Sequence, residues 1–133
     1  MKTIVAVAIL AVAAGCTAEP PAQLSATNEA KLAEALGGRV QAGPPQSCVT
    51  QRNLGGNRSA GEGAIIFSTS ASDLVYVNQP TAGCPDIRSN AIRTRTTTSQ
   101  LCSGDIVEMF DPVNNIPYGS CALGEFTPYR RPR

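Results

Sequence analysis

The sequence predicts an all-β fold: a small disulfide-stapled barrel or two-layer sandwich of about six strands, preceded by a signal peptide, a tether and one short helix. Three observations predict it. Beyond residue 47, apolar residues gather in short runs with the period of strands rather than of helices. Turn-forming Gly, Pro, Asn, Asp and Ser residues separate these runs. Four cysteines are spread along the same stretch, as in small exported domains.

Residues 1–15 have the organisation of a bacterial signal peptide. Lys2 precedes a 12-residue apolar run over residues 3–14, which is shorter than the about 20 residues needed to span a bilayer. The run ends in Ala-Ala-Gly-Cys16, which resembles the lipobox of bacterial lipoprotein precursors, where the cysteine is lipidated and becomes the new N-terminus. We therefore expect lipidation at Cys16. The alternative is an ordinary secretory signal cut after Ala13 or Ala18.

Residues 16–46 are expected to form a tether that carries the short helix. Prolines and small residues dominate the segment after Cys16, and ten extended residues would reach about 33 Å. Thr17 follows the candidate lipid site. In enteric lipoproteins an Asp at that position favours the inner membrane, so the resemblance implies an outer membrane lipoprotein that faces the periplasm.

One helix is predicted over residues 28–36. Thr27 is the expected N-cap, and Gly37 with Gly38 is the expected stop. A helix this short is marginal alone, so it should dock through its apolar face. That face consists of Leu32, Ala35 and Leu36.

The β domain is placed at residues 47–128, followed by a basic tail at 129–133. Its expected strands cover residues 48–54, 64–69, 74–78, 92–98, 105–110 and 120–126. Residues 70–73 should close a hairpin, residues 78–83 should form a loop, and residues 114–119 should turn into the last strand. The expected core residues are Ile65, Phe67, Val75, Val77, Ile106, Phe110, Leu123 and Phe126.

The chain contains five cysteines, an odd number that Cys16 would explain if it carries the lipid. The other four then form two disulfides in an oxidising periplasm, with three possible connectivities. We favour Cys84 with Cys102 and Cys48 with Cys121, which would nest a local loop inside a clamp between the first and last strands. The wide spacing of the cysteines argues against a zinc site.

Three stretches of the β domain resemble a family of small exported proteobacterial proteins of unknown function. They are Cys48-Val49, then Tyr-Val-Asn78 with Gly-Cys84-Pro, and finally Gln-Leu-Cys102-Ser-Gly-Asp-Ile with Gly-Ser-Cys121-Ala-Leu-Gly-Glu-Phe-Thr-Pro. The resemblance covers about 80 residues. It implies the fold and the exported location, and it supplies no catalytic residues. The chain departs from the family in its Gly-rich residues 55–63.

Composition excludes several kinds of chemistry. Because the chain has no His, it can form neither a Ser-His-Asp nor a Cys-His nucleophile system. It also lacks the G-x-S-x-G and C-x-x-C motifs, and Lys31 stands apart from any serine motif. A net charge of +1 provides no large field to attract nucleic acid or an anionic membrane. We therefore expect a protein that is not an enzyme, has no cofactor or metal and binds no nucleic acid.

Candidate binding residues lie in two places. Arg93 and Arg95 share one face of a predicted strand and, with Arg88, could bind phosphate or carboxylate groups of envelope polymers. The favoured interpretation is that these arginines suppress edge pairing. Asn57 and Arg58 lie in the Gly-rich segment 54–63, which could insert into a partner, although a mobile connector is favoured.

An acidic group forms a further candidate. Asp105, Glu108 and Asp111 fall within seven residues, but strand geometry separates the first two, which favours solvated or turn-capping roles over a cation site. The basic tail at 129–133 could touch an anionic surface, although a solvated tail is favoured.

Two functions follow. The first is a lipid-anchored structural or interaction module of the bacterial cell envelope, attached to the membrane through its N-terminal lipid, whose partner is an envelope protein or a cell-wall polymer. The alternative is a periplasmic inhibitor of a cell-wall hydrolase. It would resemble the small lipidated lysozyme inhibitors and would insert the segment 55–63 into an enzyme cleft.

Overall fold

The computed structural model describes residues 26–84, 87 and 91–133. The expected signal peptide, Cys16 and Arg88 lie outside these residues. One α-helix, α1, covers Ala26–Leu36. It ends where predicted, because Gly37 and Gly38 both adopt positive φ. It already includes Thr27, so Thr27 is not its N-cap.

The largest sheet has five antiparallel strands in the order β1-β10-β5-β4-β3. Their bounds are Val40–Gln41 for β1, Leu54–Ser59 for β3, Ile65–Thr69 for β4, Leu74–Asn78 for β5 and Phe126–Arg130 for β10. The hairpin between β4 and β5 confirms the predicted turn at residues 70–73, where the Thr69 hydroxyl bonds the backbone of Ala71 and Leu74. The loop predicted after β5 is also confirmed.

Two smaller antiparallel sheets complete the β structure of the described residues. β2 (Cys48–Thr50) pairs with β7 (Gln100–Cys102), and a 3-10 turn at Gln51–Asn53 joins β2 to β3. The second sheet has the order β6-β8-β9. Its strands are Ile92–Thr94, Ile106–Phe110 and Pro117–Ala122. The all-β prediction is therefore confirmed, and the sheets do not close into a barrel.

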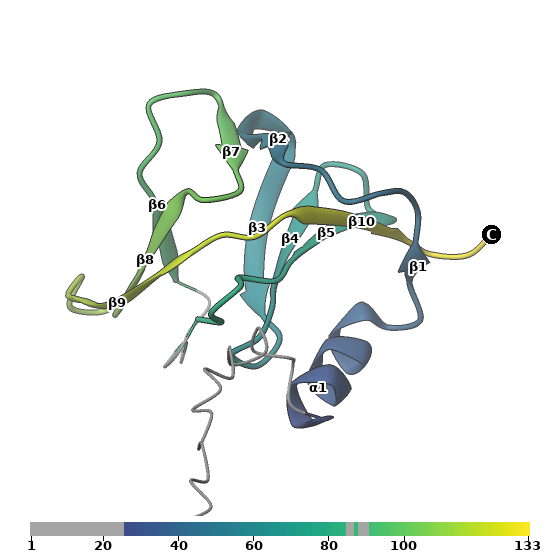
Figure 1. Ribbon diagram of the computed structural model, residues 1–133, viewed down its shortest axis with the longest axis horizontal. Coiled ribbons are helices and arrows are strands. Elements are labelled where there is room, and N and C mark those ends of the chain that lie inside the picture. Colours follow the sequence, from purple (N-terminus) through teal and green to yellow (C-terminus); the bar gives the residue numbers. More distant parts are fainter. Residues whose placement is uncertain (1–25, 85–86, 88–90) are drawn as a thin grey trace, which may run out of the picture.

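The five-stranded sheet is covered on both faces (Figure 1). One face packs against α1 through Ile66, Val75 and Val77, and the predicted docking residues of the helix lie in this cluster. The other face carries Ile65, Phe67 and Phe126 and packs against the two smaller sheets. Double coverage explains why β4 and β5 read as continuous apolar runs rather than as alternating ones.

The predicted strand 120–126 is divided between two sheets. β9 ends at Ala122 and β10 begins at Phe126. At the break, the fully buried Asn78 side chain donates to the Gly124 carbonyl oxygen and accepts from the Gly124 N–H, both at 2.8 Å. A Cβ at position 124 would collide with the carbonyl oxygen of Gln79, so only glycine fits. This clamp lets the chain leave one sheet and enter the other.

The Gly-rich segment is a strand rather than a long loop, which corrects the sequence interpretation. Residues 54–59 form β3 and pair with β4, leaving a short turn at residues 60–64. The Ser68 hydroxyl bonds both the N–H and the carbonyl oxygen of Gly56, at 2.9 and 2.8 Å. These bonds hold a bulge between Leu54 and Asn57, where the pairing register shifts.

Most of the predicted core residues are buried, but the face assigned to β8 was wrong. Ile106 is 52% exposed and Phe110 is half-buried, whereas Val107 and Met109 are buried. Alternating residues of a strand point to opposite faces. Choosing the wrong face of a strand therefore replaces all of its buried residues with residues of the other face. Apolar residues stand on both faces of β8, and the pattern therefore could not select between them.

Both disulfides are present, but the favoured pairing was wrong. The bonds join Cys48 to Cys102 and Cys84 to Cys121. Cys48 and Cys102 are directly opposed in the β2–β7 ladder. The pairing of two strands separated by about 50 residues fixes this connectivity, and spacing alone does not reveal it.

Residues before and after the predicted bounds of the β domain pair within the five-stranded sheet. β1 pairs with β10, and Gln46 forms a bridge with Phe126. The basic stretch begins inside β10, where Arg130 forms an ion pair with Asp73 at 2.8 Å, so residues 131–133 alone extend beyond the strand. Within the described part of the chain, no helix combines the length and apolarity needed to cross a membrane.

Candidate functional site

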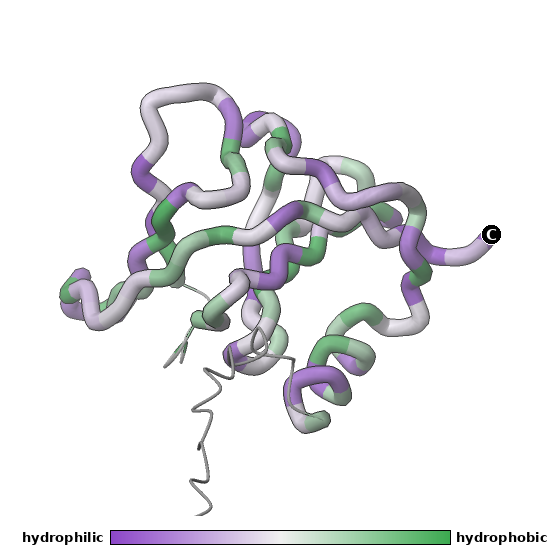
Figure 2. Tube along the Cα trace, in the orientation of Figure 1, coloured by the Kyte–Doolittle hydropathy of each residue, from purple (hydrophilic) through white to green (hydrophobic). Residues whose placement is uncertain are grey.

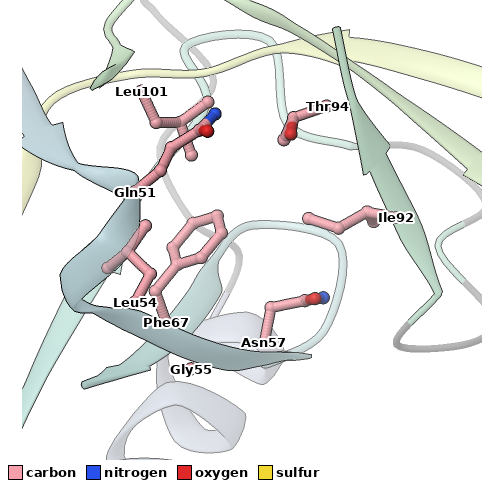
Figure 3. A pocket seen from close by; sticks show the side chains of 8 residues that line it. All are labelled: Gln51, Leu54, Gly55, Asn57, Phe67, Ile92, Thr94 and Leu101. Carbon is pink, nitrogen blue, oxygen red and sulfur yellow. The ribbon is translucent and has the colours of Figure 1, made fainter. Parts of the chain in front are cut away.

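A cavity of about 200 Å³ opens where the edge of the five-stranded sheet faces the two smaller sheets (Figure 3). Strands β3, β4, β6 and β7 and the turn before β3 contribute its walls. We call it the interlayer cavity. Its lining residues are Gln51, Leu54, Gly55, Asn57, Phe67, Ile92, Thr94 and Leu101.

The bulge in β3 shapes one wall of the interlayer cavity. Gly55 lies so close to β4 that a Cβ there would stand 3.2 Å from the Ser68 hydroxyl. The Ser68 bonds to Gly56 fix this approach. As a result, Leu54 and Asn57, on either side of the bulge, both line the cavity.

The β2–β7 ladder and its disulfide position the opposite wall. The Gln51 N–H donates to the Ser99 carbonyl oxygen at 3.0 Å and so extends the pairing beyond β2. Leu101, one residue before disulfide-bonded Cys102, is buried in the main core and lines the cavity. The Cys48–Cys102 bond therefore holds together the two segments that carry Gln51 and Leu101.

The chemistry of the cavity is neutral and amphipathic. Phe67 and Leu101 are buried, while Leu54 and Ile92 are half-buried apolar residues. The amides of Gln51 and Asn57 and the hydroxyl of Thr94 supply the polar groups. None of the eight lining residues is ionisable. The site thus suits an uncharged group that has an apolar face and hydrogen-bonding substituents.

The two predicted arginines that the structure describes, Arg93 and Arg95, do not line this cavity. The Arg93 guanidinium lies 4.8 Å from the centre of the Phe110 ring and donates to the Asn115 side chain. Arg95 forms an ion pair with Glu108 at 3.3 Å. Arg93 stands on β6, an edge strand of its sheet, whereas β6 ends at Thr94, so Arg95 lies just beyond the strand. Both arginines are therefore engaged by neighbouring residues of the same sheet.

Asn57 and Arg58, the two candidate binding residues of the Gly-rich segment, lie in different parts of the structure. Asn57 lines the interlayer cavity, and among the predicted binding residues that the structure describes it is the only one that does so. Arg58 instead donates to the Ala35 carbonyl oxygen at 2.7 Å. A guanidinium at a helix C-terminus satisfies an unpaired carbonyl group and complements the helix dipole. Arg58 thus fastens α1 to β3.

The acidic residues perform turn and pairing roles. The Asp105 carboxylate accepts the Cys102 N–H at 2.7 Å. The Asp111 carboxylate accepts the N–H groups of Val113 and Asn114, and these bonds lower its pKa below the ordinary value. No group of three or more His, Cys, Asp or Glu that could hold a metal is found among the described residues.

Sequence reasoning missed most of the interlayer cavity. Ile92 and Thr94 are two residues apart on one strand, so their shared face could have been recognised. Gln51 and Leu101 come together only through the β2–β7 pairing, which carries no local turn signal. No protein-family model, curated protein or solved structure matches this chain.

Proposed function

We propose that this protein is a lipid-anchored interaction module of the bacterial cell envelope, with no catalytic activity of its own, that binds a neutral unit of a cell-wall polymer in the interlayer cavity. The observation that carries the proposal is the cavity itself, with its apolar base and its two amides and one hydroxyl. Attachment at Cys16 would hold this cavity near the membrane surface.

The disulfides support an exported location. Disulfides persist in oxidising compartments such as the periplasm and are rare in the bacterial cytoplasm. Cys84 and Cys121 are buried at their bond, and the second bond closes the β2–β7 ladder beside the cavity. The lipobox-like segment ending at Cys16 agrees with the same location.

The size and neutrality of the cavity support the choice of ligand. Sites for drug-sized molecules occupy about 300–1,000 Å³, and this cavity is smaller, at about 200 Å³. It has room for one ring rather than for an extended chain. An acetamido sugar offers an apolar ring face together with amide and hydroxyl groups, and it carries no charge. Such sugars are the uncharged repeating units of cell-wall glycans.

The inhibitor hypothesis has less support. It depended on residues 55–63 entering an enzyme cleft as a loop, and residues 54–59 instead form β3. The turn that remains, at residues 60–64, lies beside α1. Gly61 is so close to the helix that a Cβ at this position would collide with the Asn28 side chain. An inserting role would therefore require a different part of the molecule.

Co-sedimentation with purified insoluble cell wall tests the proposal. Thr94→Val removes one hydroxyl from the cavity with almost no change of shape, and we expect binding to weaken by about 2- to 10-fold, the value of one neutral hydrogen bond. Gln51→Ala should weaken it by a similar factor.

Thr97→Val is the matched control, because Thr97 is exposed and does not line the cavity. A wild-type protein that stays in the supernatant would contradict the proposal. So would equal effects of the Thr94 and Thr97 substitutions.

A further inference from the structure

The β8–β9 hairpin carries apolar side chains into solvent at its end. Val113 is 87% exposed, Ile116 60% and Tyr118 40%. We call these three residues the hairpin tip. Figure 2 shows strongly hydrophobic positions beside hydrophilic ones at this end of the molecule, whereas the loop between β6 and β7 shows no strongly hydrophobic position. Single exposed apolar residues are ordinary, but a group at one projecting end marks a contact surface.

The hairpin tip is an ordered structure. The Asp111 carboxylate accepts the Val113 N–H at 2.7 Å and the Asn114 N–H at 3.2 Å. The Asp111 carbonyl oxygen accepts the Asn115 N–H at 2.7 Å, and the Asp111 N–H donates to the Ile116 carbonyl oxygen at 2.9 Å. Asn115 adopts φ of 56°, which asparagine tolerates better than most residues. These bonds hold Val113 and Ile116 outward instead of letting them fold back.

A positive charge lies at the base of the hairpin tip. The Arg93 guanidinium stacks on the Phe110 ring at 4.8 Å and bonds the side chain of Asn115, within the turn. Arg93 is half-buried, so part of it still meets solvent. Apolar residues at an extremity, with Tyr and Arg behind them, follow the depth order of a membrane interface, from acyl chains to headgroups.

We propose that the hairpin tip is a second, reversible membrane contact, in which Val113 and Ile116 enter the boundary between the headgroups and the acyl chains of a lipid bilayer. This inference rests on the proposed function, because attachment at Cys16 would supply the nearby membrane. The hairpin projects from the body of the domain as a convex end (Figure 1). A convex apolar end fits a fluid lipid surface, whereas docking on a protein requires a matching groove.

The length of chain between Cys16 and α1 permits this contact. The ten residues that lead to Ala26 reach at most about 33 Å. A compact domain of about 100 residues has a radius of gyration of about 13 Å, so the tether is about as long as the domain is wide. A fully extended tether therefore spans about the width of the domain, which brings the hairpin tip within reach of the membrane.

The contact should be weak without the lipid. One myristoyl chain gives only marginal membrane binding, and the side chains of Val113 and Ile116 together contain fewer carbon atoms than such a chain. With the lipid in place, the second contact becomes intramolecular, and the high effective concentration favours it. The hairpin tip would thus orient the domain at the membrane rather than recruit it.

A tryptophan reporter tests the inference, because the chain has no Trp of its own. The full-length gene with Val113→Trp is expressed in the native host, and the purified product is reconstituted into phosphatidylethanolamine and phosphatidylglycerol vesicles. We expect a blue shift of its emission, and quenching by lipids brominated along their acyl chains. Ile106→Trp is the matched control, since Ile106 is an exposed apolar residue of the same strand pair that lies away from the tip. Its emission should stay that of a solvated indole.

Intact mass separates failure of the anchor from failure of the hairpin tip. If Cys16 carries lipid and the indole of the Val113→Trp variant remains solvated, the membrane contact is overturned. If Cys16 carries no lipid, the anchor is overturned, and the membrane contact that rests on it is overturned with it. A shift that depends on protein concentration without vesicles would assign the hairpin tip to a second copy of the chain and overturn the lipid assignment.

Discussion

The two β layers of this domain are built by different means. In the five-stranded sheet, β3, β4 and β5 follow one another through short turns and pair with their neighbours in sequence. In the opposite layer, β2 pairs with β7 across about 50 residues, and β6 pairs with β8 while β7 lies between them in the chain. The disulfides and the Asn78 clamp all involve this second layer. Local turns build the β3–β4–β5 part of one layer, which β10 and β1 join from distant parts of the chain. Long-range links hold the other layer in place around its local β8–β9 hairpin.

The largest expected effect comes from removing the link between the layers. Cys84→Ala with Cys121→Ala should lower the free energy of unfolding by about 2–5 kcal/mol, as measured by urea unfolding. The Cys48→Ala and Cys102→Ala pair should cost less. The Cys48–Cys102 bond closes a longer loop than the Cys84–Cys121 bond does. This difference in loop length changes the loop-closure entropy by only about 0.3 kcal/mol. Cys84 and Cys121 are buried, so their loss also leaves space in the core, whereas Cys48 and Cys102 are half-buried.

Hydrogen exchange sharpens the same comparison. Without the Cys84–Cys121 bond, amides of β8 and β9 should lose protection before those of β4 and β5, because the latter belong to locally connected hairpins. Simultaneous loss of protection in both layers would contradict the division. A greater loss of unfolding free energy on removing the Cys48–Cys102 bond than on removing the Cys84–Cys121 bond would also contradict it.

The Asn78 clamp should give the next effect. Asn78→Ala leaves the buried N–H and carbonyl oxygen of Gly124 without their partners, and we expect a loss of about 2–4 kcal/mol in the free energy of unfolding. Asn53→Ala is the control, since Asn53 is exposed. Equal stability of the two variants would show that the junction between β9 and β10 does not depend on this side chain.

A smaller effect is expected where α1 joins the five-stranded sheet. Arg58→Ala removes the charged donor to the Ala35 carbonyl oxygen and should cost about 1–2 kcal/mol. Amide exchange within α1 should accelerate, while exchange in β8 and β9 stays unchanged. Arg52→Ala, at an exposed position, should leave both unaltered. Unchanged helix exchange in Arg58→Ala would mean that apolar packing alone docks α1.

The smallest effect concerns acid stability at the end of β10. A hydrogen bond from Arg130 lowers the pKa of Asp73 below its ordinary value of 3.8. A lowered carboxyl pKa stabilises the fold above the unfolded-state value, and this stabilisation is lost as pH falls through the native value. Asp73→Asn should therefore weaken the acid dependence of the melting temperature below about pH 4. Superimposable pH profiles of the variant and the wild type would contradict this role.

Much of the locally connected layer could be predicted from sequence. The helix stop at Gly37, the β4–β5 hairpin and most of the core depend on neighbours in the chain, so local patterns reveal them. β3 was missed because its glycines indicate a loop, and only the Ser68 side chain of the next strand holds them extended. The face of β8 was missed because Ile106 and Val107 are both apolar.

The candidate site was less predictable, because it lies where the layers meet. Asn57 was named for the wrong reason, as part of a loop. Gln51 and Leu101 belong to the cavity only because Cys48 pairs with Cys102, and the favoured connectivity had separated these cysteines. Arg93 and Arg95 looked like binding residues because their partners, Phe110 and Glu108, lie on the neighbouring strand.

The intact mass of the protein from its native host, before and after reduction, tests the central claim most directly. We predict the mass of residues 16–133 plus acyl chains, with a gain of four hydrogen atoms on reduction, two for each disulfide. That result would establish a lipid-anchored, oxidised envelope protein. A mass without lipid that starts at another residue, or one that does not change on reduction, would contradict the claim.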